Sequence, residues 1–368
     1  MKPLYSLTIL VFGLASAAAL AQGSRPVVTQ DANPVAAGFA PERTGNYSAG
    51  MRALSVVDDR SDRALEGLIW YPASASEPTS PDFRSEVWVG AEVAREAAAA
   101  NGSFPLVVLS HGMFGNSRNQ AWFAASMARR GYVVAAIDHP GTSTWARDPD
   151  QRRALWERSH DITRLIDFAL SPEGLPVQVD PDRVFMAGHS LGGFTALTLA
   201  GARFDAARLE RFCGAHVGEM VCGIFDDWDI AETPEDRKRM GADLSDGRIR
   251  GFAVFDLGGT QSFSEESLGR VHRPMIVFGA PIMNSGLTLD IESRALVEAL
   301  PSGSFRYVEP ATLTHFDFFN LCTPGGYDLL AREEPGDEII CEHGGAHRAA
   351  MHEMILDEVT AFFAESLH

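Results

Sequence analysis

The chain is poor in basic residues and in cysteine, and after its first residues it has no long apolar run. Its 368 residues contain 31 Lys and Arg against 49 Asp and Glu, a formal net charge of −18 at pH 7. A surface this acidic repels nucleic acid and anionic membranes, so we expect neither as a partner. No stretch after residue 21 is apolar over enough length to cross a bilayer, and the chain has no internal repeat.

The first 21 residues have the features of a secretory signal peptide. Lys2 supplies the positive start, residues 7–14 the apolar stretch, and Ala19-Leu-Ala21 a small-x-small cleavage site. The alternative is a membrane anchor, for which the apolar run is too short. No cysteine precedes Cys213, which excludes a lipid-modified cysteine at the cleavage site. We therefore predict an exported protein, periplasmic or secreted, without a stable membrane anchor.

The four cysteines form two local pairs along the chain, Cys213 with Cys222 and Cys322 with Cys341. Export favours disulfides, and of the three possible connectivities the sequential one closes the shortest loops. A metal site is the rival interpretation, but the spacings lack Cys-x-x-Cys. Zinc is also suggested by His343, His347 and His352, although these lack the glutamate of a zinc-hydrolase helix. We interpret the three histidines as solvated side chains and predict no metal site.

The most informative stretch is Gly188-His189-Ser190-Leu191-Gly192-Gly193. An apolar run at 184–187 precedes it, and a helix-prone run at 194–200 follows it. Strand, Gly-x-Ser-x-Gly and helix is the order of a nucleophile elbow, in which a tight turn exposes the serine hydroxyl and glycines prevent clashes. The alternative is an ordinary strand-to-helix turn that uses glycine for geometry alone. We predict that Ser190 is a nucleophile, with a helix N-terminus beside the oxyanion that forms on attack.

The rest of the chain predicts an α/β fold with a mostly parallel sheet covered by helices on both faces. Residues 22–48 are expected to be an extended lead-in, and 49–368 one hydrolase-like domain. Within it, residues 203–248 break the pattern and are expected to be an insertion beside the active site, either a lid clamped by the first cysteine pair or a solvated connection. Expected strands are 51–57, 64–71, 106–109, 132–137, 183–187, 249–255, 275–278 and 304–308, and expected helices are 117–130, 150–170, 289–300 and 346–365.

A serine hydroxyl needs a positioned base, which in such a fold follows the final strand. His315 comes just after the expected strand 304–308 and is the predicted base. Other histidines fit less well, since His189, inside the elbow, is expected to point away from the serine.

The predicted acid, which orients the base, is Asp256 at the end of an expected strand. The loop 279–286, where the acid most often lies, has no carboxylate. Asp290 and Glu292 follow at an expected helix start, where helix capping already explains an acidic residue. Asp290 remains the alternative.

The oxyanion that forms on attack needs backbone donors, and we predict the N–H groups of Met113 and Leu191. Glycines at 112 and 115 let the first loop curl over the site, and His111 is expected to brace it. Aromatic residues near these segments are candidates for a substrate pocket, with core packing as the alternative for each: Phe114, Trp145, Phe316 and Phe319.

With these residues in place, the chain resembles the α/β-hydrolase superfamily, and within it the platelet-activating-factor acetylhydrolase and predicted dienelactone hydrolase-like group. The resemblance covers most of residues 50–365. It rests on Ile69-Trp-Tyr-Pro72, Ser110-His-Gly-Met113, Ala136-Ile-Asp-His-Pro-Gly141, Gly188-His-Ser-Leu-Gly-Gly193, Phe255-Asp256 and Thr314-His315-Phe316. The acetylhydrolases carry the acid after the strand that follows the nucleophile helix, which supports Asp256. Dienelactone hydrolases proper use a cysteine nucleophile, whereas this chain has Ser190.

The resemblance implies ester hydrolysis without metal or other cofactor. The sequence therefore predicts an exported serine hydrolase that cleaves small carboxylic esters, short-chain or lipid-derived, through an acyl-enzyme. The alternatives are an amidase or acyltransferase with the same triad, and a non-catalytic binding protein on the same scaffold.

Overall fold

The computed structural model describes residues 47–58, 61–172 and 174–367. The expected signal peptide (1–21) and nearly all of the expected lead-in (22–48) lie outside these residues. Within them, no helix is both long enough and apolar enough to cross a membrane.

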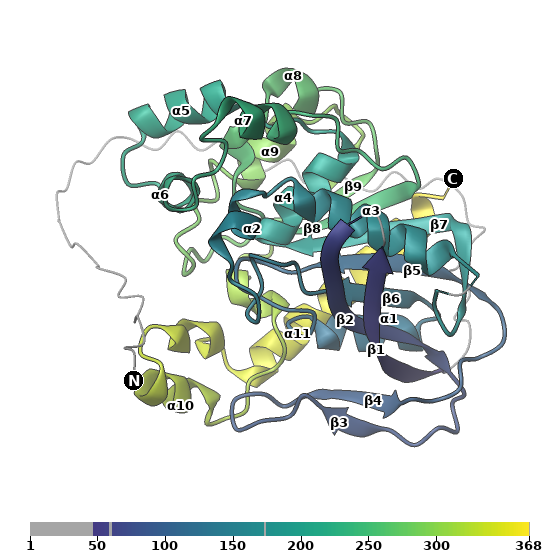
Figure 1. The fold of residues 1–368 in the computed structure, drawn as a ribbon. Helices are drawn as coiled ribbons and strands as arrows, with labels where there is room; N and C mark the ends of the chain where they lie inside the picture. The colour runs from purple at the N-terminus through teal and green to yellow at the C-terminus, as the bar shows by residue number, and fades with distance from the viewer. Residues whose placement is uncertain (1–46, 59–60, 173, 368) are drawn as a thin grey trace.

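A ten-stranded sheet runs through the described part of the chain, in the order β10-β9-β8-β7-β5-β6-β2-β1-β4-β3 (Figure 1). The six strands from β10 to β6 are parallel to their neighbours, whereas β2 is antiparallel to both β6 and β1. The strands are β1 (Ser48–Asp58), β2 (Ser61–Ala73), β3 (Ser80–Asp82), β4 (Ala91–Arg95), β5 (Ser103–Ser110), β6 (Val133–Ile137), β7 (Gln178–His189), β8 (Ile249–Phe255), β9 (Met275–Phe278) and β10 (Phe305–Val308).

The burial of each strand follows its place in the sheet. Every residue of β6 is buried, as is all of β5 after its first residue, because helices cover both faces of the parallel part. In β1, buried Leu54 and Val56 alternate with exposed Ala53, Ser55 and Val57. The alternation shows that only one face packs on the core at this end of the hairpin, whereas residues 49–51 at the other end of β1 are all buried.

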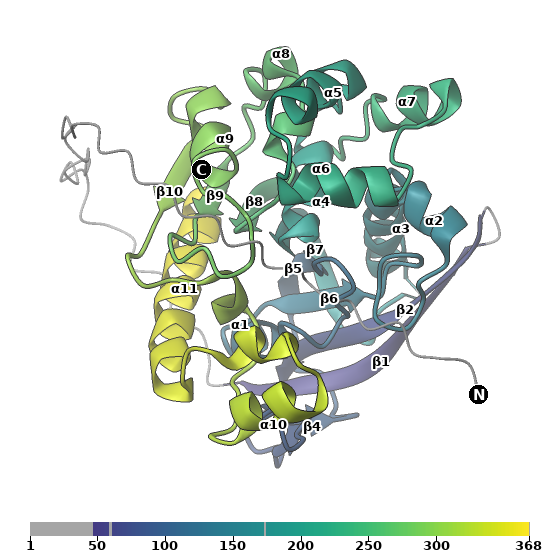
Figure 2. The same cartoon turned by 90° about the vertical axis from the view of Figure 1, so that its left-hand side faces the viewer.

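The helices divide between the two faces of the sheet, which gives two apolar cores (Figures 1 and 2). Residues of α3, α4 and α9 fill one core, and residues of α1 and α11 fill the other. The α-helices are α1 (Ala121–Arg129), α2 (Pro149–Arg153), α3 (Glu157–Leu170), α4 (Leu191–Ala200), α5 (Ala206–Ala215), α6 (Met220–Asp227), α7 (Pro234–Met240), α8 (Glu265–Leu268), α9 (Ser293–Ala299), α10 (Gly326–Glu333) and α11 (Gly345–Glu365); short 3₁₀ turns are η1 (Thr260–Ser262), η2 (His315–Phe318) and η3 (Asp337–Cys341).

The α/β fold with a mostly parallel sheet is confirmed, with local differences from the expected elements. The helix expected at 150–170 is two helices, α2 and α3. The strands β3 and β4 were not expected, because both are short and β3 is largely exposed.

Residues 203–248 contain three short helices, α5, α6 and α7, although the sequence shows little helical periodicity there. Two of these helices begin at side-chain caps, since Asp205 accepts from the Arg208 N–H and Thr233 from the Asp236 N–H. The Cys213–Cys222 disulfide joins α5 to α6. Figures 1 and 2 show the three helices together at one end of the molecule, away from α10 and β4.

Candidate active site

Ser190 stands between β7 and α4 in a backbone conformation rarely adopted by residues with a side chain, with φ 54° and ψ −117°. The chain approaches itself closely around it. A Cβ on Gly188 would lie 2.1 Å from the Gly192 oxygen, and a Cβ on Gly192 would lie 1.9 Å from the Ser110 oxygen. The two glycines are therefore required by the turn, and the turn projects Ser190 from the end of the sheet.

His315 and Asp256 come together from distant parts of the chain. The Nδ1 of His315 lies 2.7 Å from Oδ2 of Asp256, and both residues are buried. The other oxygen of Asp256, Oδ1, accepts from the Ala280 N–H at 3.0 Å. Since the Ser190 N–H donates to the Phe255 oxygen at 2.9 Å, the serine and the acid lie on neighbouring chain segments at one edge of the sheet.

Packing holds the His315 segment against the strand that carries Asp256. The ring of Phe318 stacks on Phe255, with centroids 5.0 Å apart, and both side chains are fully buried. Burial of one such ring contributes about 1.5–3 kcal/mol to the free energy of unfolding. The turn η2 is thus docked on β8 independently of the bond between His315 and Asp256.

Asp290, the alternative acid, lies elsewhere. Its side chain is largely exposed, and its carboxylate pairs with Arg294 at 2.6 Å. The structure thus brings His315 to Asp256 and leaves Asp290 at the surface.

Glu292 has a different role from the helix capping that the sequence suggests. It precedes α9, but its buried carboxylate accepts instead from the N–H groups of Gly259 and Thr260, at 2.9 and 2.8 Å. Burial raises the pKa of Glu292 to about 7, and the two N–H donors and Thr260 oppose that rise. Glu292 therefore anchors the loop that follows Asp256.

His189 does not simply point away from the site, as the sequence suggested. Its Nε2 donates to the backbone oxygen of His315 at 2.9 Å, and the two rings are 4.4 Å apart. Burial holds the pKa of His189 well below its ordinary value, so the ring is neutral. The His189 side chain thus holds the backbone of the His315 segment in place.

The loop after β5 lies against the serine, where oxyanion donors were expected. The approach is so close that a Cβ on Gly112 would be 3.1 Å from the Ser190 Cβ. Met113 is the residue after Gly112 in this loop, and Leu191 directly follows Ser190 as the first residue of α4. His111 braces this loop as expected, since its Nδ1 donates to the Gly112 oxygen at 2.7 Å.

Arg158 is a residue that sequence reasoning missed. It is buried on α3, where its guanidinium donates to the Ser110 hydroxyl at 3.0 Å and to the His111 oxygen. Burial lowers its pKa to about 9, which leaves it charged at neutral pH. A charged side chain on the inward face of an amphipathic helix was the available signal.

An apolar cavity of about 50 Å³ opens at Ser190. The insertion supplies half of its lining, from α6 and the residue that ends it. The lining residues are Met113, Ser190, Leu191, Met220, Val221, Ile224, Phe225, Trp228, Gly258 and Leu287.

The four aromatic residues expected to form the pocket are not among the residues that line this cavity. Phe114 packs behind Trp228 with centroids 5.4 Å apart, and Trp145 is 61% exposed. Phe316 and Phe319 contact each other beside His315. The sequence suggested an insertion beside the active site, but no local signal shows which of its side chains face the serine.

The second cysteine pair also forms a disulfide in the structure, Cys322–Cys341, and it lies just after the His315 turn. His352, expected to be solvated, is instead buried. Its ring stacks on Trp122 with centroids 3.4 Å apart, and its Nε2 is 2.9 Å from the backbone oxygens of Asp317 and Phe319. The expectation was wrong for this residue because α11 turns it into the core.

A parallel sheet with a serine elbow after β7, an acid after β8 and a histidine after the last strand defines the α/β-hydrolase fold. The chain therefore has the α/β-hydrolase fold. A family model described as serine aminopeptidase, S33 matches residues 103–212, which include the elbow.

Among characterised proteins, the chain is similar to cutinases and to a terephthalate ester hydrolase over part of its length. Cutinase est2 of Thermobifida alba is 30% identical over 138 residues, which cover 36% of this chain and 42% of the cutinase. The bis(hydroxyethyl) terephthalate hydrolase of Streptomyces coelicolor is 25% identical over 145 residues, 39% of this chain and 43% of that protein. The chain thus spans less than half the length of these relatives.

A solved structure extends the similarity of fold to nearly the whole chain. The ferulic acid esterase from Streptomyces cinnamoneus superimposes with a TM-score of 0.57 over 89% of this chain and 91% of that one, at 19% identity. At this identity the likeness concerns the fold alone.

Proposed function

We propose that the protein is an exported serine hydrolase that cleaves small carboxylic esters through an acyl-enzyme intermediate. The observation that carries the proposal is the buried pair of His315 and Asp256, 2.7 Å apart, at the sheet edge where Ser190 leaves its elbow. A serine, a carboxylate and a histidine in this order along the chain are the residues of the triad in this fold.

Each residue has a defined step in this proposal. Ser190 Oγ attacks the ester carbonyl, while Nε2 of His315 takes the hydroxyl proton and returns it to the leaving alcohol. Asp256 accepts from Nδ1 of His315, which leaves Nε2 free as the base and stabilises the imidazolium. The Met113 and Leu191 N–H groups bind the oxyanion, an interaction worth about 3–4 kcal/mol per donor. Water activated by His315 then releases the acid.

The cavity favours small, apolar acyl groups. Its volume of about 50 Å³ leaves room for a short chain, and the residues of α6 on its wall carry no charge. The similar proteins are named as cutinases, a terephthalate ester hydrolase and a ferulic acid esterase, and all three names describe ester cleavage. The finer resemblance to platelet-activating-factor acetylhydrolases stays a prediction.

We propose further that the insertion is a lid over the site. The residues of α6 that face Ser190, among them Ile224 and Phe225, would have to move for larger substrates to enter. Export fits the two disulfides, because such bonds persist in oxidising compartments.

The amidase alternative is favoured by one observation, the match of residues 103–212 to the serine aminopeptidase model. Turnover of p-nitrophenyl esters of increasing chain length, compared with matched p-nitroanilides, separates the two activities. We expect ester turnover to dominate and to fall as the acyl chain lengthens. Faster turnover of the anilides than of the esters would instead support the amidase alternative.

The nucleophile is tested by Ser190→Ala, which we expect to fold normally and to lose ester turnover by a factor of about 10⁶. Labelling with a fluorophosphonate probe should disappear in the same variant. Labelling that persists in Ser190→Ala, or activity above a few per cent with an unchanged Tm, contradicts the assignment. A wild-type protein that neither turns over esters nor reacts with the probe is the outcome expected of a binding protein on this scaffold.

A further inference from the structure

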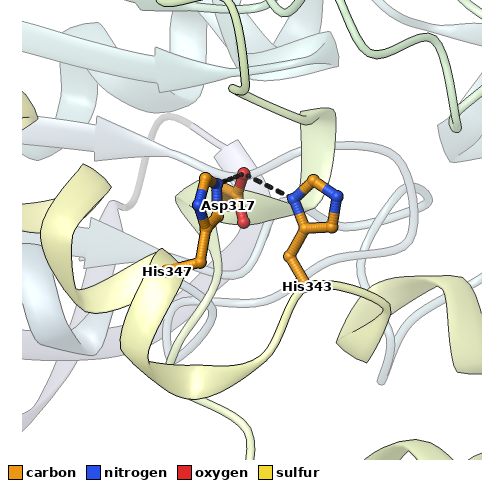
Figure 3. Close-up of side chains that lie close together, drawn as sticks. All are labelled: Asp317, His343 and His347. Carbon is orange, nitrogen blue, oxygen red and sulfur yellow. Dashed lines mark ion pairs between the residues drawn. The ribbon is translucent and has the colours of Figure 1, made fainter.

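Three potential ligands converge at a point just beyond the His315 turn (Figure 3). The His343 Nδ1 and the His347 Nε2 each lie 3.6 Å from Oδ2 of Asp317. The three ligating atoms all lie within 4.8 Å of one another. Asp317 comes from η2, whereas the histidines flank the start of α11, four residues apart.

We propose that Asp317, His343 and His347 bind one Zn²⁺ ion. Two imidazole nitrogens and one carboxylate oxygen, completed by water, are a ligand set that zinc prefers. In a tetrahedral zinc site with bonds near 2.0–2.1 Å, neighbouring ligand atoms lie about 3.3 Å apart. Both histidine-to-carboxylate distances are within a few tenths of an ångström of that value. The two imidazoles must approach each other on binding, and about a third of each side chain is exposed.

The carboxylate is held in place before any ion binds. Asp317 is fully buried, its Oδ1 is 3.4 Å from Nε of Arg348, and its Oδ2 accepts from the Thr314 N–H at 2.9 Å. Arg348 thus covers one oxygen and leaves the other facing the histidines. The guanidinium also donates to the backbone oxygens of Asn320 and Ile340, so its charge is shared among several acceptors.

The histidines supply an independent indication of a ligand. The Nδ1 of His343 is buried and makes no hydrogen bond within the described residues, which is a costly state for a polar atom. A zinc ion would give that nitrogen a partner. His347 Nε2 is 3.2 Å from the Thr312 oxygen, and binding would replace this contact and place the ring proton on Nδ1.

The surrounding chain brings the two segments together without the metal. Cys341 lies two residues before His343, and its disulfide partner Cys322 lies five residues after Asp317. Such a preorganised site loses little conformational entropy on binding. The zinc would add a second link between the His315 turn and α11, which makes it a structural rather than a reacting ion in this proposal.

The test is a Zn²⁺ titration of the full chain after EDTA treatment and dialysis, followed by calorimetry at neutral pH. We expect one equivalent bound with a Kd of about 1 µM or below, and a rise in Tm on binding. The double variant His343→Ala/His347→Ala should lose that equivalent and the rise in Tm. His160→Ala, which removes an exposed histidine paired with Glu157, should keep both.

Binding is read without substrate, so the result is independent of the proposed esterase activity. Asp317→Asn is a second variant, but the histidine pair decides because Asp317 also supports the His315 turn through Thr314. Absence of binding up to about 100 µM Zn²⁺, or one equivalent retained in the folded double variant, would overturn the proposal.

Discussion

Asp256→Asn tests the proposed triad through the tautomer of His315. The native carboxylate accepts twice, from the His315 Nδ1–H through Oδ2 and from the Ala280 N–H through Oδ1. An asparagine has one oxygen and one NH₂ group. If its oxygen keeps the Ala280 bond, its NH₂ group faces Nδ1 and requires that nitrogen to accept. The proton then moves to Nε2, and His315 can no longer take the proton of Ser190.

The flipped amide is no better, since it sets two donors against each other at Ala280 in a buried site. We therefore expect kcat to fall by a factor of about 10⁴, the loss seen for this change in the serine-protease triad, with KM nearly unchanged. At 1.36 kcal/mol per tenfold change, that loss is about 5 kcal/mol of transition-state stabilisation.

The assay compares kcat and KM for a short p-nitrophenyl ester at neutral pH in three proteins: the wild type, Asp256→Asn and Asp290→Asn. Asp290 is the matched control, because its exposed carboxylate pairs with Arg294 at the surface and its loss should change kcat less than about twofold. Thermal unfolding checks that each variant is folded. An Asp256→Asn enzyme within tenfold of wild type, or a larger loss in Asp290→Asn, would refute this reasoning.

Two further predictions concern stability and the second disulfide. Because burial raises the pKa of Glu292 from 4.5 to about 7, the folded protein binds this proton more tightly than the unfolded chain, so stability falls as pH rises between these values. In Glu292→Gln the free energy of unfolding should fall by about 3 kcal/mol less between pH 5 and pH 8 than in the wild type, as measured by urea unfolding. An unchanged pH dependence would contradict the assignment. Cys322→Ser/Cys341→Ser should lower the free energy of unfolding by about 2–4 kcal/mol and reduce kcat by up to about a hundredfold, because the bridge lies next to the His315 turn. Unchanged kcat with lowered stability would leave the bridge only a structural role.

The sequence predicted those parts of the fold and site that have local signals. The buried strands β5, β6, β8 and β9 and the second half of β7 are short, mostly apolar runs, and the turn around Ser190 needs glycines at fixed offsets. His315 and Asp256 could be proposed because each follows such a strand. Their 2.7 Å contact could not be read from the sequence, since 59 residues separate them.

The features that escaped prediction depend on contacts between distant segments. Ile224 and Phe225 look like ordinary apolar residues of a short helix until α6 is placed over Ser190. The role of Glu292 depends on a loop more than thirty residues before it. In the zinc proposal, the third ligand beside His343 and His347 is Asp317, which comes from another turn and so could not be found from local spacing.

The insertion leaves and rejoins the domain at neighbouring points. Phe204, at its start, pairs with Phe263, and near its end the Asp246 N–H donates to the Leu199 oxygen in the last turn of α4. Its disulfide joins α5 only to α6 and ties neither helix to the sheet. In evolutionary terms, this segment can be lengthened, shortened or exchanged without moving the segments that carry Ser190, Asp256 and His315, so the lining of the cavity can change while those segments stay in place.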